Sequence, residues 1–106
     1  MKRGDIRWAE LGPPAGRRPV LVVTRTSAID VLERIAVVPL TRTIRHIASE
    51  VPLGRDEGLR QDCVANCDSV AAIPKSVLTG ERIGSLDATR IHLLDQALRF
   101  ALDIRF

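Results

Sequence analysis

The sequence predicts a mainly β domain, a compact antiparallel barrel or half-barrel with one amphipathic helix packed against it. Two observations lead to this prediction. Five or six short runs rich in β-branched residues follow one another between residues 6 and 84, separated by turns that contain Gly or Pro. Only after residue 87 does the apolar spacing become that of a helix. A chain of 106 residues is enough for one domain, residues 1–106, and not for two.

The first two predicted strands lie on either side of a loop. Residues 6–11 have strand character, and the segment 12–16 must be a loop because its two prolines lack amide donors and its glycines are flexible. Residues 18–24 form a β-branched run typical of a buried strand. Pro19 is compatible with that strand only at its beginning or at a sheet edge.

The middle of the chain repeats this pattern with less regularity. Residues 34–41 form a second buried strand, and residues 47–53 form a weaker one. Residues 54–58 have the composition of a turn. We expect a further strand over residues 63–70.

The C-terminal part begins with a helical turn and ends in a long helix. Residues 74–78 have Pro at the first position of a predicted helical turn, and residues 81–84 form a short strand. Asp87 is a suitable N-cap because its carboxylate can accept the free amide groups of a first helical turn. The helix is predicted over residues 88–103. Its apolar stripe has helical spacing and includes Ile91, Leu94, Leu98 and Leu102.

The composition restricts the class of protein and its surroundings. Sixteen Lys and Arg residues against thirteen Asp and Glu give a net charge of +3, which suits an ordinary soluble protein as well as one with a polyanionic partner. No apolar run approaches the roughly 20 residues needed to cross a bilayer, and the N-terminus lacks a signal sequence. We therefore expect a cytoplasmic protein with no membrane contact. Aromatic residues make up only 3%, so the core is thin and a homodimer is expected.

The two cysteines are predicted to be structural thiols. Cys63 and Cys67 are four residues apart, which on a strand corresponds to roughly 13 Å and exceeds the reach of a disulfide. The two histidines, His46 and His92, show no spacing suited to metal ligands. The sequence therefore predicts neither a metal site nor a cofactor.

Five blocks of the sequence together resemble the MazF/PemK toxins. The first reads Arg-Gly-Asp-Ile-x-Trp-Ala-Glu-Leu-Gly-Pro over residues 3–13, and the second, the most recognisable, reads Gly-Arg-Arg-Pro-Val-Leu-Val-Val over residues 16–23. The third is Val-Val-Pro-Leu-Thr at 37–41. The region after the central turn (58–68) and the terminal helix (84–98) are also similar. The resemblance covers nearly the whole chain, in order and with compatible spacing.

This resemblance implies an SH3-like antiparallel barrel of the MazF/PemK/CcdB type, usually a homodimer, with a long C-terminal helix. It also implies a sequence-specific endoribonuclease that cuts single-stranded RNA and is held inactive by a cognate MazE-like antitoxin. The reaction would need no metal, because the 2′-OH of RNA can attack the adjacent phosphorus and leave 2′,3′-cyclic phosphate and 5′-OH ends.

Three residues are candidates for catalysis under this resemblance. Arg18 suits a phosphate contact because guanidinium is always charged and binds two oxygens at once; a solvated arginine or a structural ion pair is the alternative. Thr41 ends a predicted buried strand, and the matching family hydroxyl bonds the phosphate or the 2′-OH. Asp68 is a candidate general base because relatives carry a carboxylate there, with a salt bridge or an edge-strand charge as the alternative.

Five further residues are candidates for RNA binding. Arg42, Arg45 and His46 follow the third block directly, where a basic run would track the phosphate backbone; a solvated basic turn is the alternative. Arg17 is expected to contact backbone phosphate or solvent. Trp8 can stack on a base, although we favour a position in the core.

Two other functions are compatible with this type of fold. The first is a non-enzymatic gyrase poison of the CcdB type, which acts through an aromatic-Gly-aliphatic ending of the helix. The ending of this chain, Asp103-Ile104-Arg105-Phe106, does not match that pattern. The second is a catalytically silent module that binds RNA or an antitoxin and leaves RNA uncut.

Overall fold

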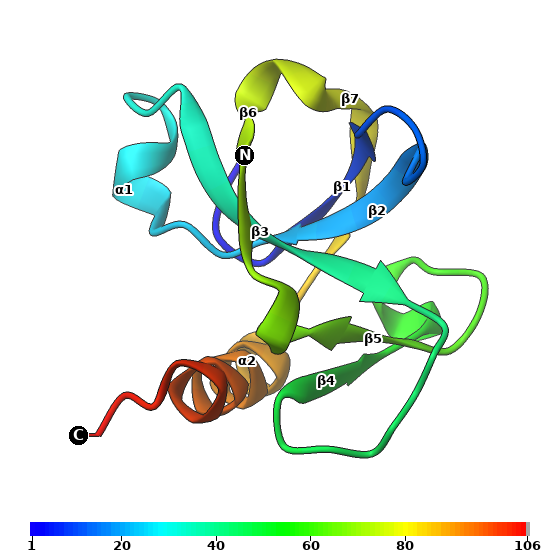
Figure 1. Ribbon diagram of the computed structural model, residues 1–106, viewed down its shortest axis with the longest axis vertical. Helices are drawn as coiled ribbons and strands as arrows, with labels where there is room; N and C mark the ends of the chain where they lie inside the picture. Colours follow the sequence, from blue (N-terminus) through cyan, green and yellow to red (C-terminus); the bar gives the residue numbers. More distant parts are fainter. Residues whose placement is uncertain (106) are drawn as a thin grey trace.

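The strands of the protein curl into a barrel-like antiparallel sheet, and the C-terminal helix lies beside one end of it (Figure 1). The computed structural model describes residues 1–105. Phe106 lies outside the described residues. It is the last residue of the C-terminal sequence that does not match the ending of a gyrase poison. The strands are β1 (Asp5–Glu10), β2 (Arg17–Val22), β3 (Arg34–Thr41), β4 (Glu50–Leu53), β5 (Cys63–Asn66), β6 (Ala71–Pro74) and β7 (Leu78–Ser85). The helices are α1 (Thr26–Ile29) and α2 (Ala88–Leu102), with 3-10 turns η1 (Arg55–Glu57), η2 (Cys67–Ser69) and η3 (Lys75–Val77).

Strand β3 connects the two parts of the sheet. The strand order is β4-β5-β3-β2-β1-β7, and β6 also pairs with β3. The first half of β3 pairs with β6 and its last two residues pair with β5, while β2 pairs with its middle. The end of β3 therefore lies where the sheet changes from one set of strands to the other. The predicted mainly β fold with a C-terminal helix is confirmed.

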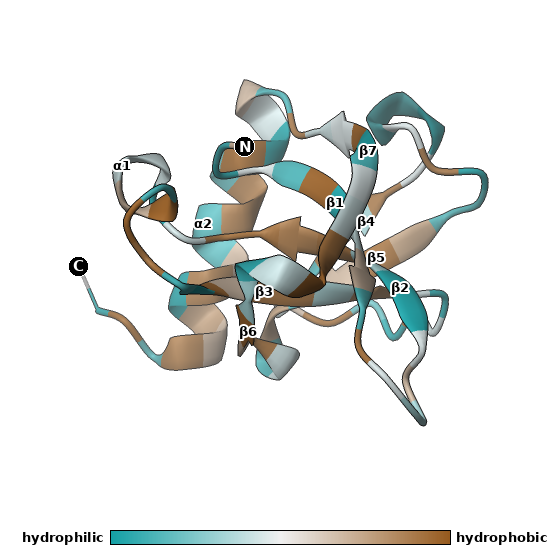
Figure 2. Cartoon of the chain, turned by 90° about the horizontal axis from the view of Figure 1, so that it is seen from above, coloured by the Kyte–Doolittle hydropathy of each residue, from teal (hydrophilic) through white to brown (hydrophobic). Residues whose placement is uncertain are grey.

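The core is aliphatic, as the composition predicts. One buried cluster lies between the sheet and α2, to which the helix contributes Leu94 and Ala97. A second cluster, which includes Val20 and Ile35, lies among β1, β2, β3 and α1. Figure 2 shows hydrophobic residues concentrated on the strands and alternating with hydrophilic ones along α2. Trp8 belongs to neither cluster.

Several predicted elements differ from those observed. The predicted strand over residues 63–70 is wrong beyond Asn66, whose side-chain oxygen accepts the amide of Asp68 at 3.0 Å and turns the chain into η2. After η2 the chain forms β6. The sequence analysis predicted neither β6 nor the short helix α1. The weak strand shortens to β4, the last short strand lengthens to β7, and the helical turn before it is confirmed as η3.

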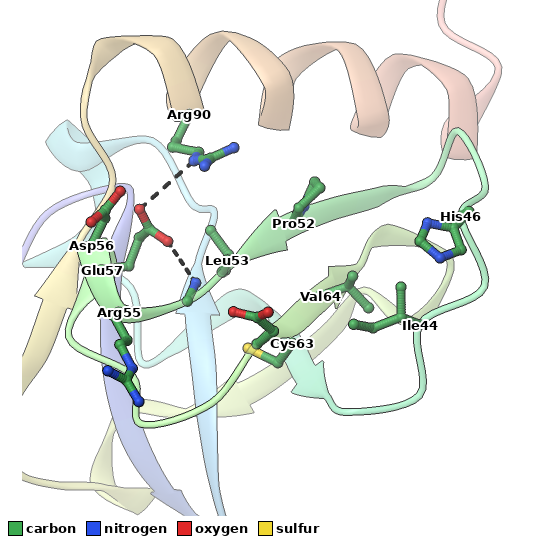
Figure 3. Close-up of a pocket in the computed structure, with 12 residues that line it drawn as sticks. Ile44, His46, Pro52, Leu53, Arg55, Asp56, Glu57, Cys63, Val64 and Arg90 are labelled. Carbon is green, nitrogen blue, oxygen red and sulfur yellow. Dashed lines mark hydrogen bonds and ion pairs between the residues drawn. The ribbon is translucent and has the colours of Figure 1, made fainter.

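A close crossing of η1 and β7 fixes the segment that follows η1. A Cβ atom on Gly84 would overlap the carbonyl oxygen of Glu57, and one on Gly58, whose φ is +88°, would overlap that of Ile83. The buried carboxylate of Glu57 accepts the amide of Gly54 at 2.7 Å and lies 3.7 Å from Nε of Arg90 on α2 (Figure 3). The backbone after Gly58 is thereby held against both β7 and the helix.

We predict that Gly84→Ala lowers the free energy of unfolding by about 3 kcal/mol, because backbone must move to admit the added methyl group. Urea denaturation followed by circular dichroism measures this change. Gly16→Ala is the control: Gly16 has φ +67° but open space around it, so its loss is limited to about 1 kcal/mol of backbone strain. Equal losses in the two variants would contradict the close crossing.

Candidate functional site

A groove of about 1130 Å³ opens along the side of the barrel where β2 begins and β3 ends. Five of the predicted site residues line it, from β1, β2, the end of β3 and the position just after it. Others in its wall come from the segment 58–63 and from β7. The predicted residues that the groove brings together are Trp8, Arg17, Arg18, Thr41 and Arg42.

The strand register accounts for the meeting of Arg18 and Thr41. Strands β2 and β3 pair with Val20 opposite Pro39 and Leu21 opposite Val38. Arg18 and Thr41 each lie two positions beyond the Val20–Pro39 pair, where the pairing of the two strands ends. Both candidate catalytic residues line the groove that opens there.

Arg18 is exposed and only partly engaged by the protein. Its Nε donates to the carbonyl oxygen of Ala15 at 3.1 Å, which ties the side chain to the preceding loop. Within residues 1–105 this is the one hydrogen bond of its guanidinium, and no carboxylate pairs with it. Both terminal nitrogens and the full positive charge are thus available to an anion in the groove.

Thr41 keeps its hydroxyl proton free. It is half-buried at the last position of β3, opposite Val64 of β5. Its Oγ1 accepts the backbone amide of Thr43 at 3.1 Å. A hydroxyl that accepts from the backbone still has one proton to donate, so Thr41 presents a fixed donor to the groove.

Arg17 and Trp8 form a stacked pair in the groove wall. The guanidinium carbon of Arg17 lies 4.3 Å from the ring centroid of Trp8, and its Nε lies 3.2 Å from the carboxylate of Glu10. Trp8 is half-buried, so the favoured core position is wrong: the small aliphatic core leaves the ring at the surface, where Arg17 covers one face. The carboxylate of Glu10 also compensates the positive charge of Arg17, whereas no described carboxylate compensates the charge of Arg18.

The predicted basic run continues along the groove for one residue only. Arg42 lines the groove, and its Nη1 donates to Oε1 of Gln61 at 3.0 Å. Arg45 and His46 do not line it, because the carboxylate of Glu50 accepts both of their backbone amides at 3.0 Å and bends the chain away. His46, with φ +56°, instead borders a smaller pocket of about 410 Å³ (Figure 3).

The smaller pocket has no comparable excess of positive charge. Asp56, Glu57 and Asp62 face it together with Arg55 and Arg90. The contact between Glu57 and Arg90 removes one charge of each sign. This balance favours a structural role for the pocket walls over capture of an anion.

Asp68 is not in the groove. It lies in η2, where its carboxylate accepts the hydroxyl of Ser49 at 2.7 Å. The turn capped by Asn66 moves it off the strand on which the sequence analysis placed it. The structure therefore gives no support to Asp68 as general base. It also shows neither of the predicted alternatives among the described residues, because Asp68 forms no salt bridge and does not lie on a strand.

Strand β7 and the loop after η1 contribute groove residues that the sequence analysis missed. Between Ile6 and Trp8 of β1 the partner residues on β7 run from Gly84 to Thr79, so residues 80–83 bulge out of the ladder. The glycines at both ends of the bulge, one with φ +70°, were the available signal. The missed residues are Arg60, Gln61, Glu81 and Arg82.

The groove is strongly positive. Five guanidinium groups line it against a single carboxylate, that of Glu81. Arg82 also approaches the buried carboxylate of Asp5, with 3.6 Å between Nη1 and Oδ1. Low-dielectric walls around charges of one sign concentrate a field that attracts polyanions. The five arginines are Arg17, Arg18, Arg42, Arg60 and Arg82.

The cysteines are buried and free, and both stay protonated near neutral pH. Burial and the nearby charge of Asp68 raise the pKa of Cys67 to about 11. Burial raises the pKa of Cys63 as well, with smaller contributions from Glu57 and Asp62. Neither thiol is therefore a nucleophile for the groove.

Residues 1–105 contain neither a metal-ion site nor a membrane-spanning helix. No three His, Cys, Asp or Glu side chains in that part of the chain gather to hold a metal ion. Neither of its helices is long and apolar enough to span a bilayer.

Comparison with known proteins gives one consistent family. The family model described as "PemK-like, MazF-like toxin of type II toxin-antitoxin system" matches residues 2–102. "Probable endoribonuclease MazF5" of Mycobacterium tuberculosis is 43% identical over 103 residues, covering 95% of this chain and 92% of the relative.

Solved structures agree with this family. "Mycobacterium tuberculosis toxin MazF-mt6" superposes with a TM-score of 0.88 and 36% identity, covering 96% of this chain and 99% of that one. An "Endoribonuclease in complex with its cognate antitoxin from Mycobacterial species" has a TM-score of 0.87 and 26% identity, covering 100% and 98%.

The raised pKa of Cys67 predicts a loss of stability at high pH. The unfolded thiol ionises near pH 9 and the folded one near pH 11, so its contribution is full below pH 9 and disappears between these values. The difference in free energy of unfolding between the wild type and Cys67→Ala should shrink by about 2 kcal/mol from pH 8 to pH 11. Urea denaturation at each pH measures it, and a constant difference would contradict the shift.

Proposed function

The chain belongs to the PemK-like, MazF-like toxins of type II toxin–antitoxin systems, and we propose that it is an endoribonuclease that cuts single-stranded RNA in the groove of Arg18 and Thr41. One observation carries this proposal: a guanidinium with uncompensated charge and a hydroxyl with a free proton line the same groove, which contains five arginines among the described residues. We further propose that the protein acts in the cytoplasm.

The proposed reaction uses the nucleophile that RNA carries. The 2′-oxygen forms a bond to the adjacent phosphorus, the bond from phosphorus to the 5′-oxygen breaks, and the products end in 2′,3′-cyclic phosphate and 5′-OH. Negative charge grows on the phosphoryl oxygens as the new bond forms. Arg18 binds two of those oxygens and Thr41 donates a hydrogen bond to the same phosphate, so both stabilise the transition state.

Proton transfer completes the scheme. The 2′-OH must lose a proton and the 5′-oxygen must gain one. Among the described acidic side chains only Glu81 lines the groove, so Glu81 takes the role of acceptor of the 2′-proton that the sequence analysis gave to Asp68. Water in the open groove donates the proton that the 5′-oxygen gains as it leaves. The fixed positive charge of the arginines performs the charge stabilisation for which many nucleases use a divalent ion.

Two protein partners are part of this proposal. One mycobacterial relative was solved with its cognate antitoxin, and the arginine-lined groove suits an acidic antitoxin segment of the MazE type that would displace RNA. A second copy of the chain is the other partner. Phe100 and Leu102 at the end of α2 are 64% and 55% exposed, an apolar surface that a homodimer would cover.

Arg18→Ala should lower the rate of RNA cleavage by at least about a hundredfold, because it removes the charge that stabilises the transition state. The measurement is cleavage of a long labelled RNA, with circular dichroism and sedimentation confirming that the variant stays folded and keeps its oligomeric state. Arg25→Ala is the matched control, since Arg25 is exposed outside the groove. Full activity of Arg18→Ala would remove Arg18 from the mechanism. A wild type that binds RNA and leaves it uncut would favour the catalytically silent module.

EDTA should leave the rate of cleavage unchanged, because the scheme assigns no step to a divalent ion. A metal-dependent nuclease in parallel reactions serves as the control for chelation. The upstream fragment should resist phosphatase until its cyclic phosphate is opened, and the downstream fragment should accept a phosphate from polynucleotide kinase directly. Activity lost in EDTA and restored by a divalent ion would refute the metal-free scheme.

A further inference from the structure

The contact between Arg42 and Gln61 fixes the orientation of an amide in the groove. Arg42 Nη1 and the amide of Gln61 are 3.0 Å apart, and both side chains line the groove. A guanidinium can only donate hydrogen bonds, so the amide atom that it contacts must be the oxygen. The NH₂ group of Gln61 then carries two donors that point away from Arg42.

The backbone on both sides of this contact is held in place. Gln61 follows Gly58, whose close approach to Ile83 anchors the segment to β7. Arg42 follows Thr41, whose position is set by pairing with β5. The amide therefore contacts the residue that follows Thr41, in the same groove as the residue that we assign to the scissile phosphate.

This part of the groove offers donors and almost no acceptors. Arg42, Arg60 and Arg82 carry only N–H groups, and the amide oxygen of Gln61 is already occupied by Arg42. Glu81 is the one carboxylate in the lining. A base edge placed against Gln61 therefore meets hydrogen-bond donors.

We propose that Gln61 selects the base next to the cleaved phosphodiester and favours the keto bases, uracil and guanine; the inference rests on the proposed ribonuclease function. Uracil O4 and guanine O6 are acceptors at the position where cytosine and adenine carry an amino group. The NH₂ group of Gln61 donates a hydrogen bond to the keto oxygen of uracil or guanine. The amino group of cytosine or adenine is itself a donor, so it cannot accept that hydrogen bond. Gln61 is exposed in the free protein. A base that covers it displaces water from the NH₂ group, and an amino group in that position offers no acceptor in return.

Gln61→Glu tests the assignment because it replaces the NH₂ group by an acceptor oxygen of similar size. The substrates are RNAs that differ only in the two nucleotides flanking the cut, uracil or guanine against cytosine or adenine. We expect the ratio of keto to amino cleavage rates to fall about tenfold in Gln61→Glu and about threefold in Gln61→Ala. Gln96→Glu, the same change at an exposed site on α2, should keep the wild-type ratio.

The ratio of rates on paired substrates separates selection from a general loss of activity. If the added charge stops Gln61→Glu from cleaving, the ratio for the neutral Gln61→Ala decides. A wild type that cleaves with no keto preference at either flanking nucleotide would overturn the inference and leave the ribonuclease function intact. So would an unchanged ratio in Gln61→Ala. A wild type that leaves every RNA uncut would overturn the proposed function as well.

Discussion

The pairing of β2 with β3 is the constraint on which the site depends. Beyond the pair Val20–Pro39, the ends of the two strands bring Arg18 and Thr41 into the same groove. A shift of this register by one residue would turn the side chains of one strand to the other face of the sheet. Both faces are buried, with Val20 in the cluster beside α1 and Leu21 in the cluster beside α2, so such a shift would exchange residues between two packed cores. Packing of the core therefore determines the geometry of the phosphate contacts.

The five arginines of the groove differ in how far their charges are compensated. Arg17 is neutralised by Glu10 and stacked on Trp8, and Arg82 approaches the buried carboxylate of Asp5. Arg18 and Arg42 are held by an uncharged carbonyl and an uncharged amide, which fix direction without reducing charge. The uncompensated charges of Arg18 and Arg42 thus lie in the groove that Thr41 lines, where the proposed reaction generates negative charge. The charges of Arg17 and Arg82 already face carboxylates.

The fold could be predicted from local patterns, because β-branched runs located the long strands. Arg18 and Thr41 lie at the ends of two of these runs, and the resemblance to the MazF/PemK toxins singled them out there. Asp68 and His46 were misplaced because side-chain contacts, from Asn66 and Glu50 to backbone amides, turned the chain where composition suggested continuity. Gln61 and Arg82 were missed because they reach the groove through contacts between distant parts of the chain, where a bulged β7 pairs with β1 and crosses η1. The glycines that flank the bulge are a local signal for it, but they do not show which distant segment it meets.

The crossing of η1 and β7 connects the groove to the far side of the molecule. Gly58 and Gly84 allow backbone-to-backbone approach, and Glu57 extends the contact to Arg90 on α2. The loop that presents Arg60 and Gln61 is therefore braced by the helix as well as by the sheet. A partner that moved the start of α2 would move this loop relative to Thr41, which is anchored separately through β5. The width of the groove thus depends on the close backbone contacts of Gly58, which lines it, and of Gly84.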